Sequence, residues 1–166
     1  MEIVSINKSI RLSEHFSLGE VTKSSHTEIN NIPSHVAIEN LKRVCVWLED
    51  LRFTYNSLYC LKPGEDYETS KNVEPIIINS GYRSPELNKK VGGAPTSNHL
   101  TGCAVDIHVA GIEQAMRYAV ILMDYADETQ QDYDELLIER NSKGHYWVHF
   151  AVRPKDNRRK TMMIQT

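Results

Sequence analysis

The chain has few cysteines, and their arrangement excludes two common site types. Its 166 residues include three cysteines, Cys45, Cys60 and Cys103. The count is odd and the spacing is wide, which fits neither a disulfide framework nor a Cys-x-x-Cys metal motif. We therefore expect reduced, partly buried thiols.

The sequence also lacks a long hydrophobic run at its N-terminus. Residues 1–8 read Met-Glu-Ile-Val-Ser-Ile-Asn-Lys, which is not the uninterrupted apolar stretch of a signal peptide or a membrane span. We therefore expect a chain made in the cytoplasm without a signal peptide, and no membrane partner.

Charge of one sign is in small excess. The formal net charge is -3, so the chain has no broad basic field of the kind that neutralises many phosphates. This predicts no nucleic-acid partner. The length, with 40% hydrophobic and 25% charged residues, is typical of one globular domain over residues 1–166, which we expect to be a monomer.

Two long segments have helical periodicity. Apolar residues recur at helical spacing over residues 34–53 and again over residues 111–125. A short helix is expected to begin after Ser84 as its N-cap, with Pro85 in the first turn, where a missing N–H costs nothing. Residues 12–20 resemble a further short helical turn.

Several short segments are apolar or alternate in the manner of strands. The two segments nearest the C-terminus flank a short polar loop and are expected to form an antiparallel hairpin. The order of elements predicts an α+β domain with a small, mainly antiparallel sheet and helices packed on it. The expected strands are residues 76–78, 103–109, 135–139 and 145–152, and the tail from residue 155 is expected to be an ordered edge or a frayed end.

Three residues have the chemistry of a catalytic zinc site. Such a site needs three protein ligands and leaves one position open, and the best trio is His99, Asp106 and His149. Strand alternation puts Val105 toward the core and Asp106 on the opposite face of the strand. In the last strand the same alternation puts the apolar neighbours of His149 toward the core and His149 on the opposite face. The chain has seven histidines, so a structural role for these two remains the alternative from spacing alone.

The motifs around these residues resemble those of a known family. Residues 97–106 fit the pattern Ser-x-His-x-x-Gly-x-Ala-x-Asp, and residues 147–149 read Trp-Val-His. Residues 80–84, Ser-Gly-Tyr-Arg-Ser, and the segment 134–139 add further matches. Together they resemble the zinc D-alanyl-D-alanine carboxypeptidase family, which includes cell-wall carboxypeptidases, vancomycin-resistance dipeptidases and phage endolysins and shares its fold with the hedgehog signalling domain. The resemblance extends from about Phe16 to Arg159.

The resemblance implies roles for individual residues. His99 and His149 would bind Zn²⁺ through imidazole and Asp106 through carboxylate. Arg83 matches an arginine that the family uses near the substrate, where a guanidinium can hold a carboxylate or stabilise charge developing on the scissile carbonyl. The alternative for Arg83 is a structural ion pair. Ser97 is expected to hydrogen-bond the loop or a ligand.

The sequence departs from better-known members at the general base. Some members place an acid three residues before the last zinc histidine and others a histidine two before it, but here these positions are Tyr146 and Trp147. Neither is a plausible base at neutral pH. We favour Glu139 as the catalytic base because it matches a family glutamate.

Two other residues are alternatives for this role. His145 lies four residues from His149, roughly 13 Å along a straight strand at about 3.3 Å per residue, so it would reach a zinc-bound water only if the strand bends. If the hairpin pairs Glu139 with His145, Glu135 falls opposite His149. His108, on the same strand face as Asp106, could support the site from outside the ligand set.

The implied reaction is zinc-assisted hydrolysis of D-alanyl bonds in peptidoglycan stem peptides. A chain without an export signal would then reach the wall as a phage or prophage lysin, or on a phage particle. One alternative is a zinc-containing wall-binding or phage structural module without catalysis, and another is an intracellular dipeptidase acting on free dipeptide. Carboxypeptidase and endopeptidase action both remain open.

Overall fold

The computed structural model describes residues 7–166 and confirms the expected α+β class. Residues 1–6 lie outside the described residues. They make up most of the N-terminal segment whose sequence lacks the features of a signal peptide. A five-stranded sheet is combined with four α-helices and one 3-10 helix in the described range.

The sheet has the strand order β1-β2-β4-β3-β5. Its first three pairings are antiparallel, whereas β5 runs parallel to β3 at the edge. The C-terminal tail is therefore an ordered edge strand. The strands are β1 (Ile78–Ser80), β2 (Ala104–His108), β3 (Glu135–Arg140), β4 (Tyr146–Ala151) and β5 (Lys160–Gln165).

Two of the helices begin after the serine N-caps Ser34 and Ser84, of which the sequence predicts Ser84. The side chain of Ser34 accepts a hydrogen bond from the backbone of Ala37, and Ser84 caps the next helix with Pro85 in its first turn. The five helices are α1 (Leu18–Thr22), α2 (His35–Tyr59), α3 (Pro85–Lys90), the 3-10 helix η1 (Asn98–Thr101) and α4 (Ile112–Thr129).

Helix α2 continues past the expected end at residue 53. The buried Asn56 side chain explains this, because its Nδ2 donates to the carbonyl of Glu74 and its Oδ1 accepts from the Glu74 backbone N–H. The polar loop after the helix is thereby fastened to the last helical turns. Periodicity of apolar residues alone could not reveal that contact.

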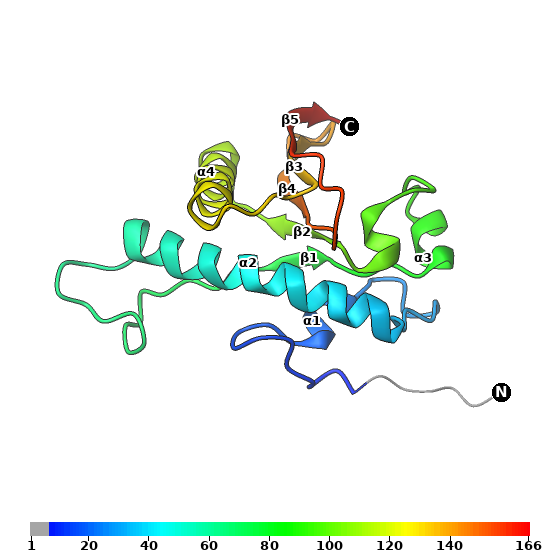
Figure 1. Cartoon of the computed structure of the whole chain (residues 1–166), viewed down its shortest axis with the longest axis horizontal. Helices are drawn as coiled ribbons and strands as arrows, with labels where there is room; N and C mark the ends of the chain where they lie inside the picture. The colour runs from blue at the N-terminus through cyan, green and yellow to red at the C-terminus, as the bar shows by residue number, and fades with distance from the viewer. Residues whose placement is uncertain (1–6) are drawn as a thin grey trace.

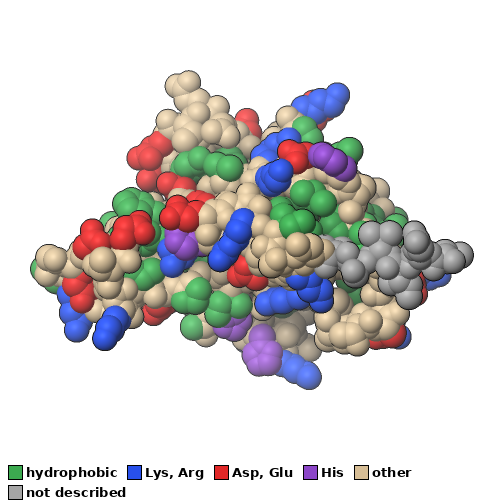
Figure 2. Space-filling view, turned by 90° about the horizontal axis from the view of Figure 1, so that it is seen from below, with side chains coloured by type: hydrophobic (Ala, Val, Ile, Leu, Met, Phe, Trp, Pro, Cys, Tyr) green, Lys and Arg blue, Asp and Glu red, His purple; other side chains and the backbone are tan. Residues whose placement is uncertain are grey.

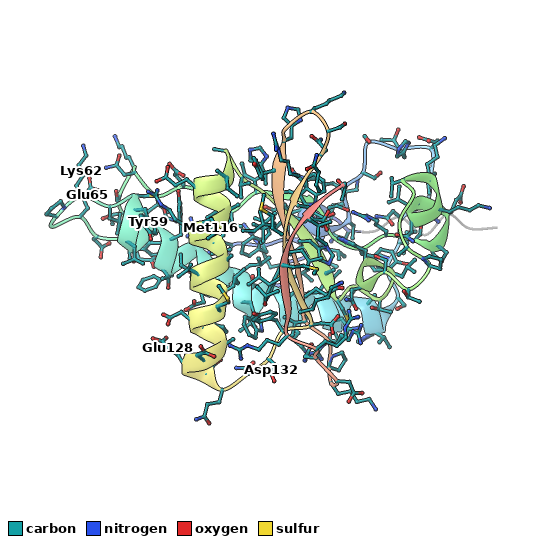
Figure 3. All side chains as sticks on the ribbon, turned by 90° about the horizontal axis from the view of Figure 1, so that it is seen from above. Tyr59, Lys62, Glu65, Met116, Glu128 and Asp132 are labelled. Atoms are coloured by element: carbon teal, nitrogen blue, oxygen red, sulfur yellow. The ribbon has the colours of Figure 1, made fainter. Side chains whose placement is uncertain are left out.

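The core lies between one face of the sheet and the helices α2 and α4. The buried Trp47 of α2 packs with its ring centroid 5.4 Å from that of Phe150 and 4.8 Å from that of Tyr125. Val105 and Val148 join this core from β2 and β4, as strand alternation predicts. Figures 1 and 3 show α4, which carries Met116 and Glu128, on one side of the strands and α3 on the other.

Residues 7–166 add three observations about the helices, the surface charges and the cysteines. In that range, no helix is both long and apolar enough to cross a membrane. On the face shown in Figure 2, basic and acidic side chains are interspersed. All three cysteines are free; Cys45 and Cys103 are buried and Cys60 is partly buried.

Candidate metal centre and active site

The loop that carries His99 is shaped by its motif residues. The hydroxyl of Ser97 accepts a hydrogen bond from the backbone N–H of His99 at 3.3 Å, as expected from the sequence, and so caps the short helix η1. Gly102 ends this helix with φ of +73°, and a Cβ there would lie 2.4 Å from the carbonyl oxygen of Ala37. Glycine is therefore required both for the backbone conformation and for contact with α2.

One ring nitrogen of His99 is used by the backbone. Nδ1 lies 2.6 Å from the carbonyl oxygen of Gly81 and donates to it, since a carbonyl can only accept. Nε2 then keeps its lone pair and lies 3.3 Å from Oδ1 of Asp106. Gly81 belongs to the Ser-Gly-Tyr-Arg-Ser segment, and a Cβ there would meet the carbonyl oxygen of Val21 at 2.3 Å.

Asp106 and His149 are brought together by sheet pairing. They are direct partners in the antiparallel pairing of β2 with β4, and Nδ1 of His149 lies 2.9 Å from Oδ1 of Asp106. One ligand atom from each of His99, Asp106 and His149 lies within 4.8 Å of the others. The three residues that the sequence predicts as ligands thus converge.

The donor set fits a zinc ion. Two ligand atoms at about 2.0 to 2.1 Å from a tetrahedral zinc lie roughly 3.3 Å apart. The separations from Asp106 Oδ1 to Nε2 of His99 and to Nδ1 of His149 are 3.3 and 2.9 Å. Two imidazoles and one carboxylate leave a fourth position for water or substrate, which is the arrangement of a catalytic site.

Glu135 supports His149 from the side away from Asp106. Its Oε2 lies 3.2 Å from Nε2 of His149 and also accepts a hydrogen bond from Nδ2 of Asn98 at 3.1 Å. The imidazole is therefore held with Nδ1 toward the ligand cluster and Nε2 toward a carboxylate, an arrangement common for metal-binding histidines.

The expected hairpin register was wrong. His149 pairs with Leu137, and Glu139 pairs with Trp147, because the loop begins after Arg140 and His145 precedes the strand. Glu135 therefore reaches His149 diagonally across the pair, with its longer side chain, and does not lie opposite it.

Charge interactions in this cluster shift three pKa values. Burial opposes protonation of His149, but hydrogen bonds to Asp106 and Glu135 outweigh it and raise its pKa to about 9. The hydrogen bond to His149 lowers the pKa of Glu135 to about 2. Burial favours the neutral form of Asp106, yet the neighbouring His99 and His149 hold its pKa well below the ordinary value. Without a metal ion, His149 is therefore protonated at neutral pH, and its positive charge balances the carboxylates of Asp106 and Glu135.

Arg83 contacts the carboxylate of Asp106, one of the three candidate ligands. Its Nη2 lies 2.5 Å from Oδ2 of Asp106, and its Nε donates to Oγ of Ser80 at 2.9 Å. The ion pair that was the alternative role for Arg83 is thus present. Arg83 nevertheless also lines the pocket over the site, so the two roles are compatible.

Glu139 is the remaining carboxylate of β3 on the site face. It is half-buried and lines the same pocket as the three candidate ligands. Burial raises its pKa, and the neighbouring charge of Asp106 adds to this effect. A carboxylate whose pKa is raised is a candidate for the general base when it lies beside a metal site. His145 and His108 are exposed, and neither lines this pocket.

The pocket extends well beyond the ligands. Its volume is ≈ 860 Å³, and the loop after α3 forms one wall. The C-terminal part of the chain contributes cations that the motif comparison did not single out. The pocket is lined by residues 91–94 and 96–99, Arg83, Asp106, Glu135, Leu137, Glu139, Trp147, His149, Arg153, Arg158, Lys160 and Thr166.

A buried carboxylate organises these cations. Asp134 is fully buried and accepts hydrogen bonds from Nη2 of Arg158 at 2.7 Å and from Nδ2 of Asn98 at 2.7 Å. Arg153 forms a further ion pair with it at 3.0 Å. The basic composition of the tail was visible in the sequence, but its contact with Asp134 depends on the parallel pairing of β5.

The comparison with protein families gives an independent result. The sequence model of the peptidase M15 family matches residues 65–138, which include Arg83, His99 and Asp106 but end before His149. No curated protein matches the sequence significantly. The match supports the resemblance found in the motifs: residues 65–138 are similar to the peptidase M15 family, the family of the zinc D-alanyl-D-alanine carboxypeptidases.

Proposed function

We propose that the chain is a zinc peptidase that hydrolyses D-alanyl peptide bonds in peptidoglycan stem peptides. The observation that carries this proposal is the convergence of His99, Asp106 and His149 in a pocket that also holds Glu139 and Arg83. The family match supports a metallopeptidase at a general level. A lysin of phage or prophage type is our proposal for its biological setting, on the resemblance alone.

His99, Asp106 and His149 would hold the zinc ion. When bound, zinc supplies Lewis-acid polarisation of the scissile carbonyl and makes water acidic enough to act as a nucleophile near neutral pH. The protein contributes by fixing the three donors in advance. The Gly81 carbonyl fixes His99, and the Glu135 carboxylate fixes His149.

Glu139 would act as the proton shuttle. It is free of the hydrogen bonds that engage Glu135, and burial raises its pKa toward the range in which a carboxylate can both take and return a proton. In this role it would accept a proton from the attacking water and deliver it to the leaving amine. Glu135 is assigned to positioning because its Oε2 is used by His149 and Asn98.

Arg83 would stabilise negative charge next to Asp106. Its Nη2 is bound to Oδ2 of Asp106 and its Nε to Oγ of Ser80, which leaves the Nη1 group of the guanidinium for the pocket. A cation at this place can stabilise charge on the scissile carbonyl oxygen as the bond to water forms.

A digest of defined muropeptides read by mass spectrometry tests the proposal. Zinc-loaded protein is expected to release D-alanine, or to cut a D-alanyl cross-link, and the mass of the product distinguishes carboxypeptidase from endopeptidase. Chelator-treated protein is the control and should release nothing until zinc is restored. Cleavage of free D-Ala-D-Ala alone would support the dipeptidase alternative.

One observation favours a second candidate function. Neither Tyr146 nor Trp147 supplies the acid or histidine that better-known relatives place there. If zinc-loaded protein cleaves no D-alanyl peptide but still sediments with purified peptidoglycan, a zinc-containing wall-binding or phage structural module becomes the better account.

A further inference from the structure

We propose that Arg153, Arg158 and Lys160 form a subsite that binds a carboxylate of the peptide substrate beside the metal centre. The inference depends on the proposed function in that the substrate is a peptide. It adds the requirement that this peptide carries a carboxylate, and it names the residues that bind the group.

The first support is the location of the three cations. All three line the same pocket as the metal cluster. The side chains of Arg153, Arg158 and Lys160 are 32%, 48% and 43% exposed, so none is hidden from a ligand in that pocket. They are supplied by β5 and by the segment that leads into it.

The second support is that the two guanidinium groups are held in place before a ligand arrives. Asp134 accepts from Nε of Arg158 at 2.9 Å through Oδ1 and from Nη2 at 2.7 Å through Oδ2, a bidentate pair. Nε of Arg153 donates to Oδ1 of Asn98 at 3.1 Å, and Nη2 pairs with Asp134. Side chains fixed in this way lose little conformational entropy when they bind a ligand.

The third support is the charge balance. The two neighbouring acids are Asp134 and Glu135, so the three cations exceed them by one positive charge (3 − 2 = +1). Lys160 has the loosest contact, because its Nζ is 3.7 Å from Oε1 of Glu135, beyond hydrogen-bond distance. Its ammonium group is therefore the donor most available to an incoming carboxylate.

The backbone before β5 is constrained in the same region. Asp156 and Arg159 have φ of 58° and 50°, in the left-handed region that non-glycine residues seldom occupy. The Asn157 side chain accepts from the backbone N–H of Arg153 at 2.8 Å, and Arg159 forms ion pairs with Asp127 and Asp132. Such backbone conformations persist where the surroundings fix them, and they are enriched at ligand-binding sites.

The sheet register gives the subsite a direction. Leu137, opposite His149, lies between Glu135 and Glu139 on the site face of β3. Lys160 pairs with Glu135, so the cations lie at one end of the metal centre and the proposed proton shuttle at the other. A peptide bound across the metal would direct its carboxylate toward Lys160 and its scissile bond toward Glu139.

Binding of matched peptides tests the subsite independently of turnover. The probes are non-hydrolysable analogues of a stem peptide ending in D-Ala-D-Ala, measured by calorimetry with zinc-loaded protein. One analogue pair differs only in having a C-terminal carboxylate or carboxamide, and a second pair only in a side-chain carboxylate or carboxamide. The pair with the larger affinity ratio identifies which carboxylate is bound.

The decisive variant is Lys160→Gln, and Lys155→Gln is its control. Lys155 lies in the same segment and is exposed, but it does not line the pocket. Lys160→Gln should reduce the carboxylate-to-carboxamide affinity ratio about tenfold, with less effect at high salt because the group is exposed. Lys155→Gln should leave the ratio unchanged.

Two outcomes would overturn the subsite. One is equal binding of acid and amide in both pairs by the unaltered protein. The other is the same reduced ratio in Lys155→Gln as in Lys160→Gln, which would indicate a general effect of net charge. A carboxylate preference that depends on Lys160 in a protein that cleaves no peptide would contradict the proposed function and leave the subsite standing.

Discussion

Oε2 of Glu135 lies 3.2 Å from Nε2 of His149, while Nδ1 of the same ring lies 2.9 Å from Oδ1 of Asp106. Glu135 thus contacts one ring nitrogen of His149 and Asp106 contacts the other, so the two carboxylates together fix the orientation of the imidazole. Partners of this kind fix the orientation of a ligating histidine and raise its basicity. This relationship separates the roles of the two glutamates on β3.

Loss of the Glu135 carboxylate should weaken zinc binding. We expect Glu135→Ala to lower zinc affinity about 10 to 100 fold, because Nε2 of His149 loses its acceptor. Glu135→Gln keeps a carbonyl oxygen and should lose less. Competition with a chromophoric chelator measures both, and Glu139→Gln is the matched control. Equal zinc affinity in Glu135→Ala and the unaltered protein would refute the positioning role.

Loss of the Glu139 carboxylate should affect turnover and not metal content. Removing a general base typically costs about 100 to 10,000 fold in rate. Glu139→Gln should therefore remain folded and zinc-loaded but lose most hydrolysis of D-alanyl peptides. Steady-state kinetics on one defined stem peptide, with metal analysis of the same sample, measures this.

His145→Ala serves as the comparison for Glu139→Gln, since His145 is exposed and lies outside the pocket lining. We expect it to keep turnover near that of the unaltered protein. If Glu139→Gln remains active while His145→Ala does not, the assignment of the proton shuttle to Glu139 is wrong.

The metal-free protein should have a distinctive pH profile of stability. The pKa of His149 is raised from 6.5 to about 9, so its contribution is fully present below pH 6.5 and is lost as pH rises through about 9. The pKa of Glu135 is lowered from 4.5 to about 2, so its contribution is present above pH 4.5 and is lost as pH falls through about 2. These two groups therefore favour greatest stability between about pH 4.5 and 6.5.

Thermal unfolding of chelator-treated protein across this range measures the profile. Zinc must displace the proton on Nδ1 of His149, so the increase in Tm from saturating zinc should grow between pH 6.5 and 9. His149→Gln, also metal-free, should flatten the high-pH decline. A metal-free Tm that rises from pH 6.5 to 9 would contradict the charge arrangement of the cluster.

The sequence was sufficient to predict the candidate ligands and the fold class. The pattern over residues 97–106 combines a cap, a left-handed glycine and an alternating strand, so local chemistry positions His99 relative to Asp106. Alternation in β4 then placed His149 on the same side as Asp106. These features are local, and local patterns are what a single sequence records most directly.

Long-range pairing could not be predicted in the same way. The hairpin register depends on where the loop around Asn141 closes, and the sequence alone misplaced it by two residues relative to His149. The contact of Asp134 with Arg158 depends on a parallel strand that returns past the hairpin. Such contacts depend on the three-dimensional path of the chain, so the cationic side of the pocket was missed.

Zinc content of the purified protein tests the metal centre most directly. Metal analysis of the unaltered protein should find one zinc per chain, and His149→Ala, which removes one of three donors, should lose it while His145→Ala keeps it. Circular dichroism would verify that His149→Ala remains folded. Full zinc occupancy in His149→Ala, or none in the unaltered protein, would contradict a metal site formed by His99, Asp106 and His149.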